Sequence, residues 1–409
     1  MIEFRRERLR AARRRIGTAR IGGAVLAGAA LIVGCSSGGQ SSGSASGSSA
    51  PYNVEIVASL TGVGGSQQAV DGYEAVIDQV NAAGGVSGHK IKFQVLDDQS
   101  SATVSASVAR QAIAANPTAI LDGSTSTYYT PRVPAYMAAK IPVIAASAVG
   151  FTPFIYTVNQ TVNQTAASIA NMAAAALGGS LSGQKVASVA IASPLGEQIN
   201  AAATTAVSKA GGTMVDTEVS PIGAPSFPAA AKLVADNPDV IVINNIASDA
   251  VVVAKALVGA GYHGKILLNY TAADDTTMKA IGVNGVLAFR LLQYPVPGTA
   301  MYETAQKYDL TAGTENGGLL FGVAWAQAYM LVDALKACAY PCKSDALVKA
   351  LNSLGTFTVP GTMQYASFSI NSSKHNAETG GQLFQWNQSD ASAVKFGSVV
   401  SIGPPDYSS

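Results

Sequence analysis

Four consecutive hydroxyl side chains, from Ser124 through Thr125 and Ser126 to Thr127, are the densest cluster of hydrogen-bonding groups that could hold a ligand. They follow the strand-like run "TAILDG", and a helix is predicted to begin near Pro131. Hydroxyls donate and accept hydrogen bonds, and backbone N–H groups at a helix start favour a carboxylate or another electronegative group. One hydroxyl can cap the helix, but four exceed that need. The segment therefore predicts a site for a polar group.

Polar residues also follow other strand-like runs. Ser147 follows "IPVIAA", and in the second half of the chain Asn244-Asn245 and Tyr270-Thr271 end "DVIVINN" and "KILLNY". In open α/β sheets, ligands bind beyond the carboxyl ends of the strands. We therefore expect a cleft with uncharged polar groups on both walls.

Aromatic side chains could supply an apolar part of that cleft. Tyr128, Tyr270 and Phe321 are the candidates, although a single aromatic residue more often belongs to a hydrophobic core.

Sequence signatures of enzymes are missing. Residues 52–409 contain no G-x-S-x-G, no H-E-x-x-H, no phosphate-binding G-x-x-x-x-G-K-[ST] and no G-x-G-x-x-G opening a helix. Its three histidines are scattered, and the Asp97-Asp98 pair at a strand end is better explained by helix or turn capping than by catalysis. We expect a protein that is not an enzyme and that uses no cofactor or metal.

The amino-terminal segment predicts export. Residues 1–34 contain eight arginines and two glutamates, and their stretch 21–34 is uncharged but shorter than the roughly 20 residues of a membrane-spanning helix. Ile32 to Cys35 resembles the lipobox of bacterial lipoproteins, which implies lipidation of Cys35; a chance cysteine is the alternative. Residues 35–51, mostly Ser, Gly and Ala, are predicted to form a flexible tether.

Charge and length bound the remaining part. Because residues 1–34 carry eight Arg and two Glu, their removal changes the formal net charge from +1 to −5, which disfavours nucleic acid as a partner. Length predicts two domains. Cys338 and Cys342 favour a small-loop disulfide in an exported protein, with a reduced pair as the alternative.

Strand-like and helix-like runs alternate from Tyr52 onward, which predicts parallel sheets joined by helical crossovers. Helices are expected to stop at Gly84-Gly85 and at Gly211-Gly212. The segments "ANPTAILDGS" and "DNPDVIVINN" form a weak repeat, so we expect two similar α/β halves. Three strand-like runs of antiparallel character close the chain.

The stretch "SLTGVGGSQQAVDGYEAVIDQVNAAGGVSGHKIKFQVLDDQS" resembles the amino-terminal signature of the leucine/isoleucine/valine-binding protein family, the type I periplasmic solute-binding proteins of ABC importers. The resemblance implies two Rossmann-like lobes joined by a three-strand hinge and closing on a ligand. It places the crossings near residues 158, 291 and 366. The expected lobes are therefore residues 52–158 with 291–366, and residues 159–290 with 367–409.

The resemblance also implies roles for individual residues. Ser126 matches the family's carboxylate-binding serine, and Ser147-Ala148 match its second carboxylate and amine segment, but Val149 stands where a threonine is expected. Leu195 replaces an aromatic residue. Thr271, or its neighbour, aligns with the acid that would pair with an ammonium group, which argues against a standard branched-chain amino acid.

Asp274 or Asp275 could replace that missing acid, although Asp275 also fits a helix cap. A small uncharged or carboxylate-bearing solute therefore fits best.

These observations predict a lipid-anchored, extracytoplasmic solute-binding protein. It would be a monomer, held at the bacterial cell membrane through Cys35, that captures an amino-acid-like, amide or carboxylate solute and delivers it to an ABC permease. A ligand sensor of the same fold, signalling to a membrane regulator, is the alternative. An exported enzyme and an adhesion lipoprotein are further rivals.

Overall fold

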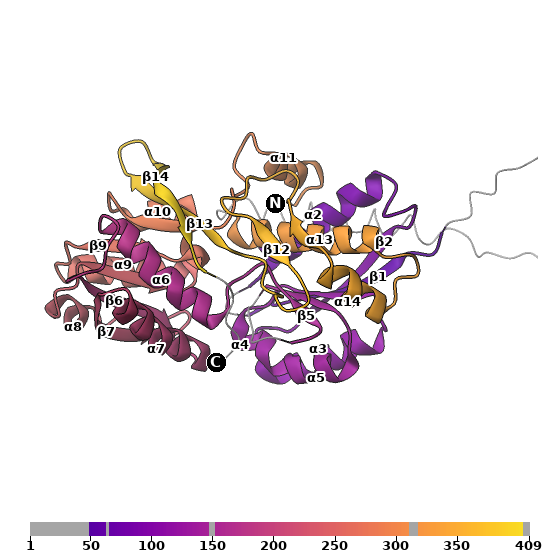
Figure 1. Cartoon of the computed structure of the whole chain (residues 1–409), viewed down its shortest axis with the longest axis horizontal. Helices are drawn as coiled ribbons and strands as arrows, with labels where there is room; N and C mark the ends of the chain where they lie inside the picture. Colours follow the sequence, from indigo (N-terminus) through magenta and orange to yellow (C-terminus); the bar gives the residue numbers. More distant parts are fainter. Residues whose placement is uncertain (1–48, 63–64, 147–151, 311–317, 404–409) are drawn as a thin grey trace, which may run out of the picture. The chain divides into compact units, whose positions relative to one another are not determined.

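The computed structural model describes residues 49–62, 65–146, 152–310 and 318–403 (Figure 1). These residues form two lobes, each built on its own sheet, together with a small two-stranded sheet. The predicted export signal, Cys35 and most of the predicted tether lie outside the described residues, as do Ser147 and Ala148.

The first lobe contains a five-stranded sheet in the order β2-β1-β3-β4-β5. All its pairings are parallel, as the alternation of runs predicted. The strands are β1 (Tyr52–Ala58), β2 (Ile91–Asp97), β3 (Ala119–Asp122), β4 (Val143–Ala145) and β5 (Ile155–Tyr156). The helices are α2 (Gln67–Ala82), α3 (Ala102–Ala114), α4 (Ser126–Tyr129), α5 (Val133–Ala139), α11 (Ala300–Lys307), α13 (Leu319–Ala337) and α14 (Ser344–Asn352).

Both faces of this sheet are buried against helices. Alternate residues of each strand point to opposite faces, so each strand contributes to two cores. On β1, Val54 and Ile56 belong to the core that includes α2 and α13, whereas Val57 belongs to the core that includes α3 and α5. The α2–α13 contact is close: a Cβ on Gly72 would lie 2.5 Å from the carbonyl oxygen of Phe321.

The second lobe contains a seven-stranded sheet in the order β14-β13-β10-β9-β8-β6-β7. Five strands are parallel, whereas β13 and β14 are antiparallel, as expected for the end of the chain. The strands are β6 (Lys185–Ile191), β7 (Thr213–Ser220), β8 (Val240–Asn244), β9 (Lys265–Leu268), β10 (Leu287–Arg290), β13 (Gly380–Asn387) and β14 (Ser392–Ser401). The helices are α6 (Val162–Ala176), α7 (Pro194–Lys209), α8 (Ala230–Ala235), α9 (Ala247–Gly259) and α10 (Asp275–Ile281).

Local sequence explains where several helices begin and end. Thr161 and Gln164 form a capping box at the start of α6, and Ser193 caps α7 by accepting a hydrogen bond from Gly196 N. After α2, Gly84 adopts φ +109°, and after α7, Gly211 adopts φ +85°, a region that favours glycine. Both predicted glycine stops are thus confirmed.

The chain passes from one large sheet toward the other after β5, after β10 and before β13. Beside the first passage, Thr157 N donates to His375 O at 2.9 Å and Ala377 N donates to Thr157 O at 2.8 Å. Beside the second, Gln293 N donates to Met363 O at 2.8 Å. The connecting segments are therefore paired with other parts of the backbone. The two-stranded sheet of β11 (Gly355–Phe357) and β12 (Phe368–Ile370) precedes the last passage.

Helix α13 is the one long, strongly apolar helix among the described residues. By length and composition alone it could cross a membrane, but 83% of its most hydrophobic window is buried inside the protein. Its side chains fill the space against α2, so α13 is a core helix.

Three aromatic rings pack where the chain enters the fold. The rings of His89 and Tyr340 stack with centroids 3.6 Å apart, and the Tyr52 ring meets both edge-on. Tyr340 lies between Cys338 and Cys342, which form the predicted disulfide. This aromatic cluster (Tyr52, His89 and Tyr340) ties β1 to the segment that follows α13.

Candidate functional site

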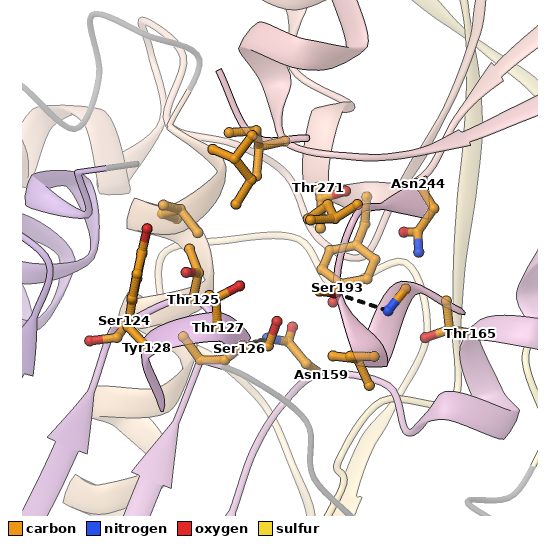
Figure 2. A pocket seen from close by; sticks show the side chains of 18 of the residues that line it. Ser124, Thr125, Ser126, Thr127, Tyr128, Asn159, Thr165, Ser193, Asn244 and Thr271 are labelled. Atoms are coloured by element: carbon orange, nitrogen blue, oxygen red, sulfur yellow. Dashed lines mark hydrogen bonds between the residues drawn. The ribbon is translucent and has the colours of Figure 1, made fainter. Parts of the chain in front are cut away.

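A cavity of about 850 Å³ lies beyond the carboxyl ends of the parallel strands (Figure 2). Its lining comes from the segments after β1, β3, β4 and β5 and from those after β6, β7, β8 and β9, together with the start of α13. Elements of both large sheets thus contribute, which is where the strand-end rule predicts a ligand. Polar lining residues include Ser124, Thr125, Ser126, Thr127, Tyr128, Asn159, Gln160, Thr161, Thr165, Ser193, Asn244, Tyr270, Thr271 and Asp274.

Most of the predicted site residues line this cavity. The structure brings together Ser124, Thr125, Ser126, Tyr128, Leu195, Tyr270 and Thr271. Ser147 and Ala148 fall outside the described residues, although their neighbour Ala146 does line the cavity. That these residues bind a ligand stays a prediction.

Two predicted residues are not at the cavity. Asn245 is fully buried and Asn244 faces the cavity instead, because successive residues of an extended chain point to opposite sides. Phe321 lies in the core: Leu319 and Val323 line the cavity, and a residue two positions from Leu319 lies on the far side of the helix.

The hydroxyl of Ser124 is held by a buried charged group. Its Oγ donates to Asp98 Oδ2 at 2.7 Å, and its backbone N donates to Asp122 Oδ1 at 3.1 Å. Arg132 lies between both carboxylates, with Nη2 2.8 Å from Asp98 Oδ2 and Nε 3.4 Å from Asp122 Oδ2. Burial raises the pKa of Asp122 above its ordinary value, although Arg132 opposes this shift. This charged triad (Asp98, Arg132 and Asp122) fixes the loop that carries the predicted hydroxyls.

The adjacent pair Asp97-Asp98 has a structural role, as the sequence indicated. Asp97 Oδ1 accepts hydrogen bonds from Leu60 N at 2.9 Å and from Gln99 N at 2.8 Å. Asp98 Oδ1 accepts one from Ser100 N at 2.9 Å. These bonds hold the turns around the end of β2.

Sequence reasoning missed the part of the lining that follows β5. Asn159, Gln160 and Thr161 lie in the first passage between the sheets and face the cavity. Asn159 Nδ2 donates to the carbonyl oxygen of Ala146, and Gln160 Nε2 donates to Glu378 Oε1 at 2.8 Å. The signal was present: "NQT" follows a short apolar strand at a predicted crossing.

The second lobe presents amides and hydroxyls. Asn269 Nδ2 donates to Asn244 Oδ1 at 2.8 Å, and Thr271 Oγ1 donates to the backbone oxygen of Asn245 at 2.7 Å. Helix α9 begins beside them at Ala247, and its N-cap residue, Ile246, makes no side-chain capping hydrogen bond. Its first backbone N–H groups are therefore donors at the cavity wall.

Asp274 is the one charged residue among the described lining residues. It is the N-cap of α10, with Oδ1 accepting from Thr277 N at 2.8 Å and Oδ2 from Thr277 Oγ1 at 2.7 Å. Burial raises its pKa. Asp275, which the sequence favoured as the cap, instead pairs with Arg290 in the first turn of α10. Across the described part of the chain, no group of three or more His, Cys, Asp or Glu side chains could hold a metal ion.

Comparisons with known proteins agree with this architecture. A family profile described as "Periplasmic binding protein" matches residues 52–392. No curated protein matches the chain.

Solved structures share the fold at low identity. A substrate-binding protein of an ABC transporter from Aeropyrum pernix has a TM-score of 0.74 at 17% identity, with 86% of this chain and 96% of that chain covered. A fatty acid ABC transporter substrate-binding protein from Thermomonospora curvata has a TM-score of 0.70 at 15% identity, with 85% and 92% covered. A branched-chain amino acid transporter substrate-binding protein from Streptococcus pneumoniae, in complex with isoleucine, has a TM-score of 0.67 at 17% identity, with 86% and 99% covered.

Proposed function

The chain belongs to the periplasmic binding protein family, and from this premise we propose that it captures a small organic solute between its two lobes and delivers it to an ABC importer. The family and the two-lobed type I fold, read first as a resemblance, are confirmed. Solved structures of this fold are named as binding proteins for amino acids or fatty acids, which supports a solute with an apolar part.

The observation that carries the proposal is the composition of the cavity wall. Hydroxyls and amides from both sheets face one space of about 850 Å³, within the size range of small-molecule sites. A solute that contacts both walls favours the closed arrangement, whereas a solute that contacts one wall equally in both arrangements shifts nothing. We infer capture and release without chemical conversion of the solute.

A thermal-shift screen of residues 49–409 tests this function. We expect at least one compound among amino acids, aliphatic amides, and aliphatic and aromatic acids to raise Tm, because a ligand at a hundredfold excess over Kd adds about 2.7 kcal/mol to the stability of the folded state. Small-angle scattering on the same sample should show a smaller radius of gyration with that compound. Turnover of the compound would contradict the proposal, and so would a screen without any stabilising solute.

We also propose that Cys35 anchors the protein outside the cytoplasm through a lipid. Wild-type protein expressed in bacteria should incorporate radiolabelled palmitate and partition into detergent, because each buried CH₂ of an acyl chain adds about 0.8 kcal/mol to the free energy of membrane binding. Cys35→Ser should remain unlabelled and in the aqueous phase. Equal labelling of both proteins would mean that the lipid is attached to another residue. No labelling of either protein would contradict the proposed lipid anchor.

The backbone pairing supports three positions at which the chain crosses between the lobes. We propose crossings at 157–161 and 291–293, close to the expected positions 158 and 291. The third, expected near 366, we place at 377–380, because β12 pairs with β11 and Ala377 still pairs with Thr157, whereas β13 begins at Gly380. We propose a monomer that meets an ABC permease as its macromolecular partner.

A further inference from the structure

Two buried amide oxygens at the cavity have no hydrogen-bond partner among the described residues. They are Asn159 Oδ1 and Gln160 Oε1, on side chains that are 3% and 1% exposed. Both residues line the cavity. A buried acceptor without a partner costs about 1–3 kcal/mol, so a ligand that donates to it gains that amount.

The partners of these amides fix which end of each is left without a hydrogen bond. Asn159 Nδ2 donates to the carbonyl oxygen of Ala146, which can only accept, so the oxygen is the end that remains. Figure 2 shows the Asn159 amide directed toward the interior beside Ser126. Gln160 Nε2 donates to Glu378 Oε1 at 2.8 Å, and Gln160 Oε1 is the end without a partner among the described residues. The first passage between the lobes therefore presents acceptors.

Formal charge is nearly absent from the rest of the wall. Among the described lining residues no side chain is basic, and the one acid, Asp274, already accepts two hydrogen bonds from Thr277. A solute carboxylate would find no cation here, and a solute ammonium would find a carboxylate that already serves as a helix cap. Burial of either ion is therefore poorly compensated.

The second lobe supplies the complementary features. The uncapped start of α9 offers backbone N–H donors to a solute carbonyl. Leu195, Ile222 and Ile246 provide apolar surface on the same side. The wall is suited to a neutral group that both donates and accepts, attached to an apolar body.

We propose that the solute is a neutral amide with an aliphatic body, whose N–H group donates to Asn159 Oδ1 and Gln160 Oε1. This inference rests on the proposed function and names the ligand class for the same cavity. Asn159 and Gln160 are therefore specificity-determining residues, because their amide oxygens cannot form a hydrogen bond with a group that carries only acceptors.

Three compounds with the same six-carbon chain test the inference: hexanamide, hexanoate and norleucine. By calorimetry at pH 7 with residues 49–409, hexanamide should bind at least tenfold more tightly than the other two, because one well-made hydrogen bond against one unpaired buried group is worth about tenfold in Kd. Tighter binding of hexanoate or norleucine would overturn the inference while the solute-binding function stood. Failure of hexanamide to bind, with another compound of the wider screen binding, would do the same.

Gln160→Met tests the acceptor directly. It removes the amide at similar length, and we expect hexanamide binding to weaken about tenfold. Gln111→Met is the matched control, because Gln111 is exposed on α3 and does not line the cavity; its effect should stay below about twofold. Equal effects of the two substitutions would overturn the inference. The ranking of the three compounds by the wild-type protein tests it even where Gln160→Met fails to fold.

Discussion

Replacing Arg132 with methionine lowers the free energy of unfolding by about 3–5 kcal/mol, the largest expected effect of any single substitution considered. The side chains of Arg132, Asp98 and Asp122 are all fully buried. Methionine fills a similar volume but leaves two carboxylates without their cation in a region from which water is excluded. Urea denaturation at pH 7 measures the loss.

The pH dependence of the same variant follows from the charges. Burial already holds the pKa of Asp122 above its ordinary value against the opposing effect of Arg132, so removal of Arg132 raises it further. A folded state with a raised carboxyl pKa binds more protons than the unfolded state, so its stability falls as pH rises. The difference between wild type and variant should therefore be smallest at low pH. A loss below about 1 kcal/mol at pH 7 would contradict the role of the triad.

Lys336→Met is the matched control. Lys336 Nζ lies 2.9 Å from Asp333 Oδ1, but this pair is on the surface, with side chains 58% and 27% exposed. An exposed pair three residues apart in a helix contributes about 0.5 kcal/mol or less. The two substitutions thus compare loss of a cation in the core with loss of one at the surface.

Replacing Glu378 with glutamine should stabilise the protein relative to wild type, and this difference in the free energy of unfolding should grow as pH rises. Glu378 is fully buried at the last passage between the lobes; Oε1 accepts from Gln160, and Oε2 has no partner among the described residues. Burial raises the pKa of Glu378 well above its ordinary value, while Gln160 and Lys374 oppose the shift. Glu378 also acts on Tyr270, whose pKa is raised first by burial and then by the charge of Glu378.

The sign follows from proton binding. The folded state retains a proton that the unfolded state releases near the ordinary pKa of 4.5, so wild-type stability is fully present below that pH and decreases as pH rises toward the folded pKa. The slope over this window is about 1.4 kcal/mol per pH unit. Glutamine keeps the acceptor for Gln160 and removes the titration, so the advantage of Glu378→Gln should grow from pH 5 to pH 8 in urea denaturation.

Glu197→Gln provides the control for this titration. Glu197 lies in the first turn of α7 and is exposed, so its replacement removes a carboxylate that water already solvates. We expect a small difference from wild type that stays constant from pH 5 to pH 8. A constant difference for Glu378→Gln as well would contradict the assignment of a buried, proton-binding carboxyl.

The fold was predictable because its determinants are local and repeated. Alternating apolar runs, glycine stops after α2 and α7, and capping residues such as Ser193 act over a few positions. The strand-end rule then located the cavity, because it depends only on the direction of parallel strands.

The facing of individual side chains was less predictable. Asn245 and Phe321 were placed at the cavity, but a shift of one residue on an extended chain, or of two on a helix, turns a side chain to the other side. Asn159 and Gln160 were missed because their orientation depends on partners far along the chain, such as Glu378, which lies 218 residues from Gln160. The local pattern "NQT" marks the crossing, but it does not tell which way these side chains face.

The aromatic cluster (Tyr52, His89 and Tyr340) would have a mechanical consequence under the proposed anchoring through Cys35. A force on the segment before Tyr52 acts first on the contacts between Tyr52 and the rings of His89 and Tyr340. Through Tyr340 it then acts on the loop that the Cys338–Cys342 disulfide closes. The load therefore ends in the first sheet. In the proposed lipid-anchored protein, tension at the amino terminus would therefore act on the first lobe and leave the proposed closure of the second lobe free.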